Sequence, residues 1–102
     1  MITYDTVLDA LADKTRRRIL EELRASPQSV GRLADRLPVS QPAISQHLRV
    51  LREAGLVTPV ADGTRRIYHL SSAGLGTLRA YVDSFWGEAL AAFSDSLTKE
   101  AK

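Results

Sequence analysis

Signals that begin and end helices recur at short intervals in the first half of this 102-residue chain, so the helices there must be short. Asp13, Ser29 and Ser40 are each suited to accept hydrogen bonds from the free N–H groups at a helix start. Pro27 ends one helical segment, because proline disfavours the helical conformation in the residue before it. Gly55 is typical of the position just after a helix. The pattern predicts three short helices, the third of which ends before Gly55.

Apolar residues at helical spacing give each predicted helix one face to bury. The third short helix shows this most clearly, with Ile44, Leu48 and Leu51 on one side. Another apolar stripe predicts a helix within residues 1–12, and the longest stripe predicts a final helix over about residues 72–98.

Two extended runs, residues 56–60 and 65–70, lie between the short helices and the final helix. Asp62-Gly63 between them is among the strongest local signals for a tight hairpin turn. Pro59 implies that the first strand lies at an edge or is short.

Two short helices joined by a tight turn and followed by a hairpin are typical of a helix-turn-helix with a wing. The predicted fold class is therefore mainly α with a β-hairpin wing: a winged helix-turn-helix of about five helices, dimeric. Because no repeat or linker interrupts the chain, we expect one domain over residues 1–102. Its predicted parts are the helix-turn-helix (29–54), the wing (56–70) and two dimerisation helices (1–12 and 72–98).

Positive charge is concentrated in the middle of the chain. Residues 14–66 hold 11 of the 14 Lys and Arg but 5 of the 12 Asp and Glu, a net charge of +6, whereas the two flanks together carry −4. This distribution favours a polyanionic partner, with chance clustering as the alternative.

The predicted third short helix presents Ser, Gln and Arg opposite its apolar stripe, and these side chains suit the base edges of a DNA major groove. Alternation along the second strand sends Arg65 and Arg66 to opposite sides, so that one of them can reach a phosphate or the minor groove. A merely solvated helix face and solubilising arginines are the alternative interpretations. The candidate DNA-binding residues are Ser40, Gln41, Pro42, Ser45, Gln46, Arg49, Gly63, Thr64, Arg65 and Arg66.

Three arginines, residues 16–18, lie in the first turn of a predicted helix, where the helix dipole disfavours positive charge. The favoured interpretation is pairing of Arg17 with Glu21 and of Arg18 with Glu22. Contact with a carboxylate or phosphate of a partner is the alternative.

The residue types for metal, redox or catalytic chemistry are scarce. The chain has no cysteine and two histidines, His47 and His69, neither of which has a second ligand at metal-site spacing. We expect His47 to be packed and hydrogen-bonded at the edge of its helix's core face, with a phosphate contact as the second possibility. No enzyme activity, metal or cofactor is expected.

The final predicted helix is too apolar for a monomer of this size. It carries Tyr81, Phe85, Trp86 and Phe93, four of the six aromatic residues, and a small core cannot cover them all. Dimerisation is favoured over intramolecular packing. The candidate dimer-interface residues are Tyr4, Leu8, Tyr81, Phe85, Trp86, Leu90 and Phe93.

No apolar run is long enough to span a bilayer, and residues 1–5 lack the pattern of a signal peptide. A soluble cytoplasmic protein without membrane contact is expected.

Two segments, residues 11–20 (LADKTRRRIL) and 40–57 (SQPAISQHLRVLREAGLV), closely resemble the arsenical-repressor (ArsR/SmtB) family of bacterial winged-helix regulators. The resemblance covers about residues 5–70. It implies a homodimeric repressor whose first and last helices form the dimer interface, whose recognition helix lies at residues 40–54 and whose wing surrounds Gly63.

The chain departs from the metal-sensing members of that family. Those members use cysteines in the helix before the recognition helix, or Asp and His residues in the last helix. Residues 30–37 contain no cysteine and the last helix contains no histidine, so the resemblance implies a branch that does not sense metals.

The sequence thus predicts a sequence-specific repressor that binds double-stranded DNA as a homodimer on a palindromic operator, with autoregulation and a small-molecule inducer left open. The alternative is a winged-helix module that binds an acidic protein partner.

Overall fold

The computed structural model describes residues 1–100, with side chains through residue 97. Over these residues the chain forms five helices and one two-stranded antiparallel sheet, which confirms the predicted number of helices and the predicted β-hairpin. The elements are α1 (Tyr4–Ala12), α2 (Lys14–Ala25), α3 (Val30–Arg36), α4 (Gln41–Glu53), β1 (Val57–Asp62), β2 (Arg65–Leu70) and α5 (Ser72–Glu100).

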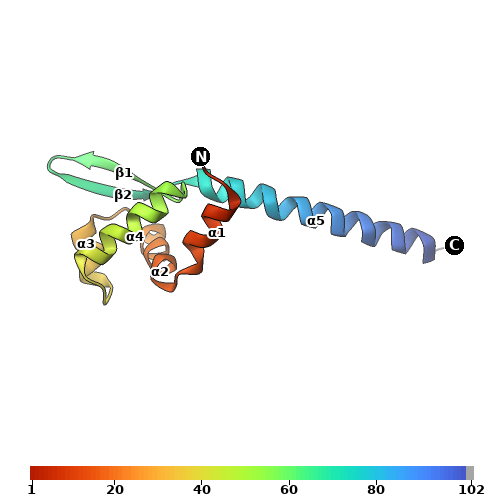
Figure 1. Ribbon diagram of the computed structural model, residues 1–102, viewed down its shortest axis with the longest axis horizontal. Coiled ribbons are helices and arrows are strands. Elements are labelled where there is room, and N and C mark those ends of the chain that lie inside the picture. Colours follow the sequence, from red (N-terminus) through yellow and green to blue (C-terminus); the bar gives the residue numbers. More distant parts are fainter. Residues whose placement is uncertain (101–102) are drawn as a thin grey trace.

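The four short helices form a body from which the hairpin and the long last helix extend (Figure 1). Helix α5 leaves the body as one rod toward the C-terminus, and the molecule measures 68 × 25 × 22 Å along its principal axes. No described helix, α5 included, is long and apolar enough to cross a membrane.

The predicted helix starts are confirmed by their hydrogen bonds. The Asp13 carboxylate accepts from the backbone N–H of Arg16 at 3.0 Å, and the Ser29 hydroxyl accepts from that of Arg32 at 3.2 Å. The Ser40 hydroxyl accepts more weakly, at 3.4 Å, from an N–H in the first turn of α4. Each side chain satisfies a backbone donor that has no partner inside its helix.

The core forms where α4 is enclosed by the other elements of the body. Ile44, Leu48 and Leu51 on α4 have no exposed surface, as predicted from their spacing. They belong to one buried cluster with residues from α1, α2, α3, β1 and β2. Burial of this magnitude contributes about 1.5–3 kcal/mol per large aliphatic side chain. The stripe fixes which face of α4 points outward.

The corner between α1 and α2 corrects the prediction for the arginines of residues 16–18. Neither Arg17–Glu21 nor Arg18–Glu22 forms an ion pair among the described residues. Instead, Arg17 Nη1 donates to the carbonyl oxygens of Leu11 and Ala12 at 2.8 and 3.1 Å.

The physical reason is that only Asp13 separates the two helices. The carbonyls at the end of α1 have no partner inside the helix and carry its negative dipole end. Arg16 and Arg17 therefore donate to carbonyl oxygens of α1, and Glu22 accepts from Arg36 Nε on α3 instead, at 2.6 Å.

The hairpin turns one residue later than its sequence signal suggests. Asp62 is the last residue of β1 and pairs with Arg65, so the loop is Gly63-Thr64. Gly63 has φ +62° and Thr64 has no positive φ, the pattern expected of a type II′ turn. The strand β1 thus extends two residues beyond the predicted run.

The base of the hairpin is attached to the loop between α2 and α3. Gln28 and Tyr68 exchange backbone hydrogen bonds, N–H of Gln28 to O of Tyr68 at 3.2 Å and the reverse at 2.8 Å. The Gln28 side chain is buried and donates to the Glu22 carbonyl oxygen at 2.9 Å. The hairpin is therefore held to the body at its base.

Helix α5 begins by crossing the end of α4 at very short range. The Gly74 N–H donates to the Gly55 carbonyl oxygen at 2.7 Å, and the Ser71 N–H donates to that of Leu56 at 2.9 Å. Gly55 has φ +72°, as expected of a glycine that follows a helix. A side chain at Gly74 would overlap the Ala54 carbonyl oxygen, so a glycine is required at this crossing.

We predict opposite effects for two neighbouring glycine substitutions in α5. Gly74→Ala should destabilise the protein by about 1–3 kcal/mol, because the added methyl group overlaps the end of α4. Gly76→Ala is the matched control: its methyl group meets no atom within 4 Å, so it should stabilise the helix by up to about 1 kcal/mol. Urea denaturation followed by circular dichroism measures both, and equal effects would show that the crossing tolerates a side chain.

Candidate nucleic-acid interface

The outward face of α4 presents the polar side chains that the sequence singled out. Ser45, Gln46 and Arg49 are exposed, opposite the buried stripe of the same helix. Ser40, Gln41 and Pro42 are exposed at the N-terminal end of α4. Because the opposite face of the helix is fully buried, these side chains are carried on an element that cannot rotate in place.

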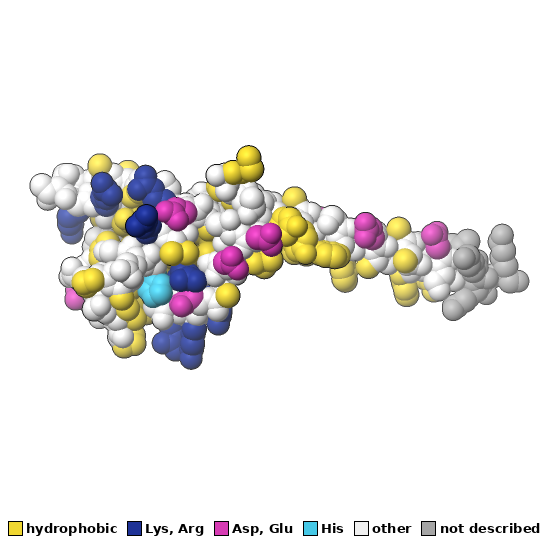
Figure 2. Space-filling model, in the orientation of Figure 1, with side chains coloured by type: hydrophobic (Ala, Val, Ile, Leu, Met, Phe, Trp, Pro, Cys, Tyr) yellow, Lys and Arg dark blue, Asp and Glu magenta, His cyan; other side chains and the backbone are white. Residues whose placement is uncertain are grey.

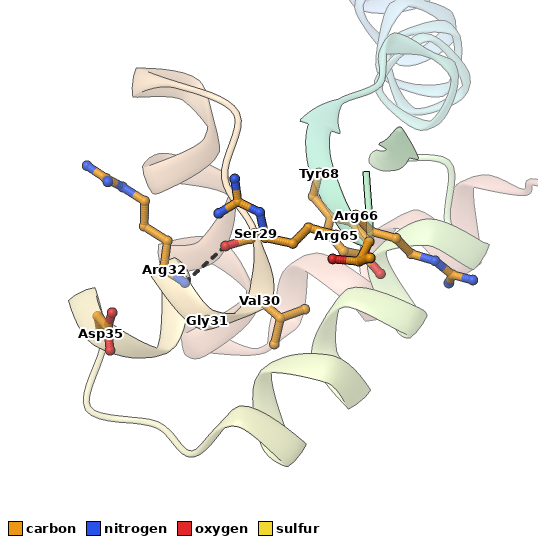
Figure 3. A pocket seen from close by; sticks show the side chains of 9 residues that line it. Ser29, Val30, Gly31, Arg32, Asp35, Arg65, Arg66 and Tyr68 are labelled. Carbon is orange, nitrogen blue, oxygen red and sulfur yellow. Dashed lines mark hydrogen bonds between the residues drawn. The ribbon is translucent and has the colours of Figure 1, made fainter. Parts of the chain in front are cut away.

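The wing brings its own basic residues beside this helix. Gly63, Thr64, Arg65 and Arg66 are all exposed. Figure 3 shows the two arginines directed to opposite sides of β2, as strand alternation predicts. Arg65 lines a groove on the α3 side, whereas Arg66 also lines a groove on the α4 side.

The two grooves adjoin each other across the hairpin. The first has a volume of about 660 Å³ and lies between α3 and the wing (Figure 3). The second has a volume of about 740 Å³ and lies between α4 and the wing. Val30, Arg66 and Tyr68 line both, so the structure joins helix face and wing into one concave surface.

Two arginines that sequence reasoning did not select also line this surface. Arg32 of α3 borders the first groove and Arg52 of α4 borders the second, and both are exposed. Figure 2 shows Lys and Arg atoms gathered at the end of the molecule that carries the hairpin. The net positive charge of residues 14–66 indicates a basic surface, but it does not identify which arginines lie beside the wing.

One of the candidate residues, Arg49, has an acidic partner on its own helix. Its Nε lies 3.3 Å from Oε1 of Glu53, and both side chains are largely exposed. An exposed pair of this kind contributes about 0.3–0.5 kcal/mol. The pair therefore holds Arg49 only weakly, and a stronger acceptor can replace Glu53.

An ion pair joins α3 to α2. Arg36 Nε donates to Glu22 Oε2 at 2.6 Å, and the Gln28 amide lies 3.5 Å from the same oxygen. The Arg36 hydrogen bond, with a smaller contribution from Gln28, lowers the pKa of the Glu22 carboxyl below its ordinary value of 4.5. The ionised form thus helps to hold α3 against the body.

The candidate dimer-interface residues lie on α1 and α5. Tyr4 stacks on Tyr81 with ring centroids 4.0 Å apart, and Tyr81 meets Phe85 edge to face at 4.9 Å. Five of the candidate residues have between 42% and 63% of their surface exposed: Leu8 (42%), Phe85 (56%), Trp86 (63%), Leu90 (50%) and Phe93 (62%). Figure 2 shows this apolar surface along α5.

A short helix, a tight turn, a capped amphipathic helix and a basic hairpin together define a winged helix-turn-helix. This is the class of protein to which the fold and surface belong.

Comparison with known proteins places the chain within that class. The helix-turn-helix domain family matches residues 11–60. The HTH-type transcriptional regulator Rv2034 of Mycobacterium tuberculosis is 48% identical over 103 aligned residues, which cover 98% of this chain and 96% of that protein. The solved ArsR-like transcriptional regulator from Rhodococcus sp. RHA1 is 40% identical with a TM-score of 0.74, covering 90% of each chain.

A third relative is the winged helix-turn-helix DNA-binding domain of Mb0332 from Mycobacterium bovis, described as homodimeric and as a possible ArsR-family regulator. It is 31% identical with a TM-score of 0.65, covering 84% of this chain and 80% of that one. The protein belongs to the ArsR/SmtB family of winged helix-turn-helix transcriptional regulators. Members of this family are regulators and not enzymes.

We predict that Glu22→Gln weakens the protein in a pH-dependent way. Because the folded-state pKa of Glu22 is lowered, its contribution to stability is present above about pH 4.5 and is lost as the pH falls through the folded-state value. The variant should be less stable than the wild type at pH 7 and should lose less stability on acidification. Thermal unfolding between about pH 7 and pH 3 measures this.

Glu21→Gln is the matched control, because Glu21 is exposed and forms no ion pair among the described residues. Identical acid profiles for the two variants would contradict a role for Glu22 in holding α3.

Proposed function

We propose that the protein is a homodimeric transcriptional repressor that acts in the cytoplasm on a roughly palindromic operator in double-stranded DNA. The observation that carries this proposal is the outward face of α4, where Ser45, Gln46 and Arg49 lie opposite a fully buried stripe and beside a basic wing. Repression follows when the bound dimer occupies DNA that RNA polymerase needs.

In this proposal α4 enters the major groove by its N-terminal end. Gln46 is suited to a bidentate contact with adenine and Arg49 to one with guanine, while Ser45 can serve either base. Ser40, Gln41 and Pro42 lie at the leading end of the helix. Arg49 exchanges its exposed contact with Glu53 for the base, at small energetic cost.

The wing supplies contacts that do not depend on the base sequence of the DNA. Arg65 and Arg66 extend from β2 beside the turn at Gly63 and Thr64, and at least one of them reaches a phosphate or the minor groove. Arg32 and Arg52 extend the same basic surface along the two grooves. Neutralising phosphates releases bound counterions, so this part of the affinity should fall steeply with salt.

The dimer forms through α1 and α5. From Val82 to Leu97 every side chain of α5 is exposed, including Phe85, Trp86 and Phe93. An exposed apolar surface of this length favours a protein interface. The homodimeric relative supports this assembly. Two-fold symmetry then places two copies of α4 about 34 Å apart, on successive major grooves.

The first experiment is fluorescence anisotropy with the DNA upstream of the protein's own coding sequence and with a scrambled duplex, over a salt series. Tight binding to the native fragment alone supports an autoregulatory repressor. Equal, steeply salt-dependent binding to both shows a basic surface without specificity. In that case other promoters are tested, and then an acidic protein partner.

We predict that Gln46→Ala and Arg49→Ala each cost about 1–3 kcal/mol of binding free energy at particular base pairs and relax specificity there. Arg66→Ala should instead weaken all sequences alike and reduce the salt slope by about one. Binding to an operator and to its single-base variants separates the two effects.

Arg24→Ala is the charge-matched control, because Arg24 lies on α2 away from both grooves. A uniform loss with Arg49→Ala would contradict its assignment as a base-reading residue. Unchanged DNA affinity with both α4 variants would favour the alternative of an acidic protein partner.

We predict that Trp86→Ala shifts the protein from dimer toward monomer. Trp86 is 63% exposed, so its removal leaves the core of the single chain intact and acts on the interface. Sedimentation equilibrium measures the dissociation constant. Glu88→Ala, on the opposite face of the same helix, is the control and should leave it unchanged. An unaltered dimer in the Trp86 variant would place the interface elsewhere.

A further inference from the structure

A small apolar cavity lies where α5 leaves the body. Its volume is about 180 Å³, and leucines from α2, β2, α5 and the loop after α4 form most of its wall. The residues that line it are Leu20, Glu21, Arg24, Leu56, Leu70 and Leu75. An apolar cavity of roughly 150 Å³ accepts a group of the size of benzene, so this cavity has room for one large apolar side chain.

The cavity lies at one end of a continuous stripe along α5. With 3.6 residues per turn, a set of side chains spaced alternately by three and four residues falls within an arc of about 80°. All members of this set are exposed, and all except Arg79 are apolar. They are Leu75, Arg79, Val82, Trp86, Leu90, Phe93 and Leu97. The stripe thus runs from the cavity wall at Leu75 to Leu97.

The far end of the stripe cannot fold back into the cavity of its own chain. Helix α5 is one rod that leaves the body (Figure 1). At 1.5 Å per residue, Leu97 lies about 33 Å along this rod from Leu75. A side chain that fills the cavity must therefore come from another molecule. Because the stripe itself also needs a partner of equal length, a second copy of this chain can cover both.

The stripe is symmetric about Trp86. Val82 and Leu90 lie four residues before and after it, and Leu75 and Leu97 lie eleven residues before and after it. In an antiparallel pair of helices with Trp86 on the two-fold axis, these residues face each other across the two chains. Leu97 of one copy then meets Leu75 of the other, at the cavity. Other antiparallel registers leave apolar residues uncovered at an end of each stripe.

The polar member of the stripe also has a suitable partner in this register. Arg79 lies seven residues before Trp86, and Phe93 lies seven residues after it. A guanidinium group is attracted to the face of an aromatic ring. Arg79 Nε lies 3.6 Å from Oδ2 of Asp83, and both side chains are largely exposed, so this pair holds Arg79 only weakly. Arg79 of one copy can therefore contact Phe93 of the other.

We propose that Leu97 of a second copy fills the cavity between α2, β2 and α5, and that the two α5 helices run antiparallel with Trp86 on the two-fold axis. This inference rests on the dimer of the proposed function. It adds to α1 and α5 a third contact surface, formed by Leu20, Leu56 and Leu70. Because Leu70 ends β2, the end of the second copy's α5 contacts the base of the wing.

The test uses introduced cysteines, because the chain has none of its own. A variant with both Leu75→Cys and Leu97→Cys should form a covalent dimer on mild oxidation, and so should one with Val82→Cys and Leu90→Cys. The four single variants should not. Their cysteines would lie about 12 Å or more apart along the axis, which is beyond the reach of a disulfide.

Three results of this experiment would overturn the proposal. Covalent dimers of the single variants would show parallel helices. Failure of both double variants, in a protein that sediments as a dimer, would show another register. A covalent dimer of the Val82→Cys and Leu90→Cys variant alone would show that Leu97 lies outside the cavity. A protein that is monomeric at every concentration would instead refute the dimer of the proposed function.

A second measurement removes the side chain that fills the cavity. Leu97→Ala should raise the dissociation constant of the dimer by about 10- to 100-fold, because each dimer loses two buried leucine contacts. Leu97 is about half exposed in the single chain, so its fold should not change. Asp95→Ala, on the opposite face of α5, is the matched control for sedimentation equilibrium. Equal dissociation constants for the two variants would leave the cavity to another occupant, such as a small apolar molecule, and would contradict the proposal.

Discussion

Everything proposed for this protein depends on the burial of one side of α4. Ile44, Leu48 and Leu51 have no exposed surface, and they lie in a cluster to which α1, α2, α3 and both strands contribute. Interiors of this kind are close-packed, so the helix cannot turn about its axis without opening voids. The exposed face is thus determined by the apolar one, and polar residues at the intervening positions become a surface of defined geometry.

The wing is positioned by a different kind of interaction. Its contact with the loop before α3 consists of two backbone hydrogen bonds between Gln28 and Tyr68, supported by the buried Gln28 side chain. Backbone pairing sets distance and direction but places no demand on side-chain identity. The tip at Gly63 and Thr64 is exposed, so the hairpin combines a fixed base with an accessible end.

The local features of the fold could be predicted from the sequence, because each depends on neighbours within a few residues. The caps at Asp13, Ser29 and Ser40, the glycine after α4 and the hairpin all follow from such short-range rules. The features that could not be predicted join distant segments. Arg17 was predicted to pair with Glu21, four residues away. It donates instead to the end of the preceding helix, since helix termini leave carbonyls unsatisfied.

The candidate surface shows the same division. The outward residues of α4 follow from helical periodicity alone. By contrast, Arg32 and Arg52 belong to this surface only because the hairpin lies beside α3 and α4. The hydrogen bond between Arg16 Nη1 and His47 Nδ1 joins residues 31 positions apart, and the spacing of the two residues does not predict it.

The long uncovered stretch of α5 has a consequence for how the protein responds to its own abundance. A lone helix of this kind gains little from its own backbone in water, because most helical stability in proteins comes from packing. In the proposed dimer, the ordering of α5 and the pairing of two chains become one event. The concentration of dimer then depends on the square of the monomer concentration. Occupancy of an operator in the protein's own promoter would then rise more steeply than the number of chains, so a small increase in synthesis would be strongly opposed.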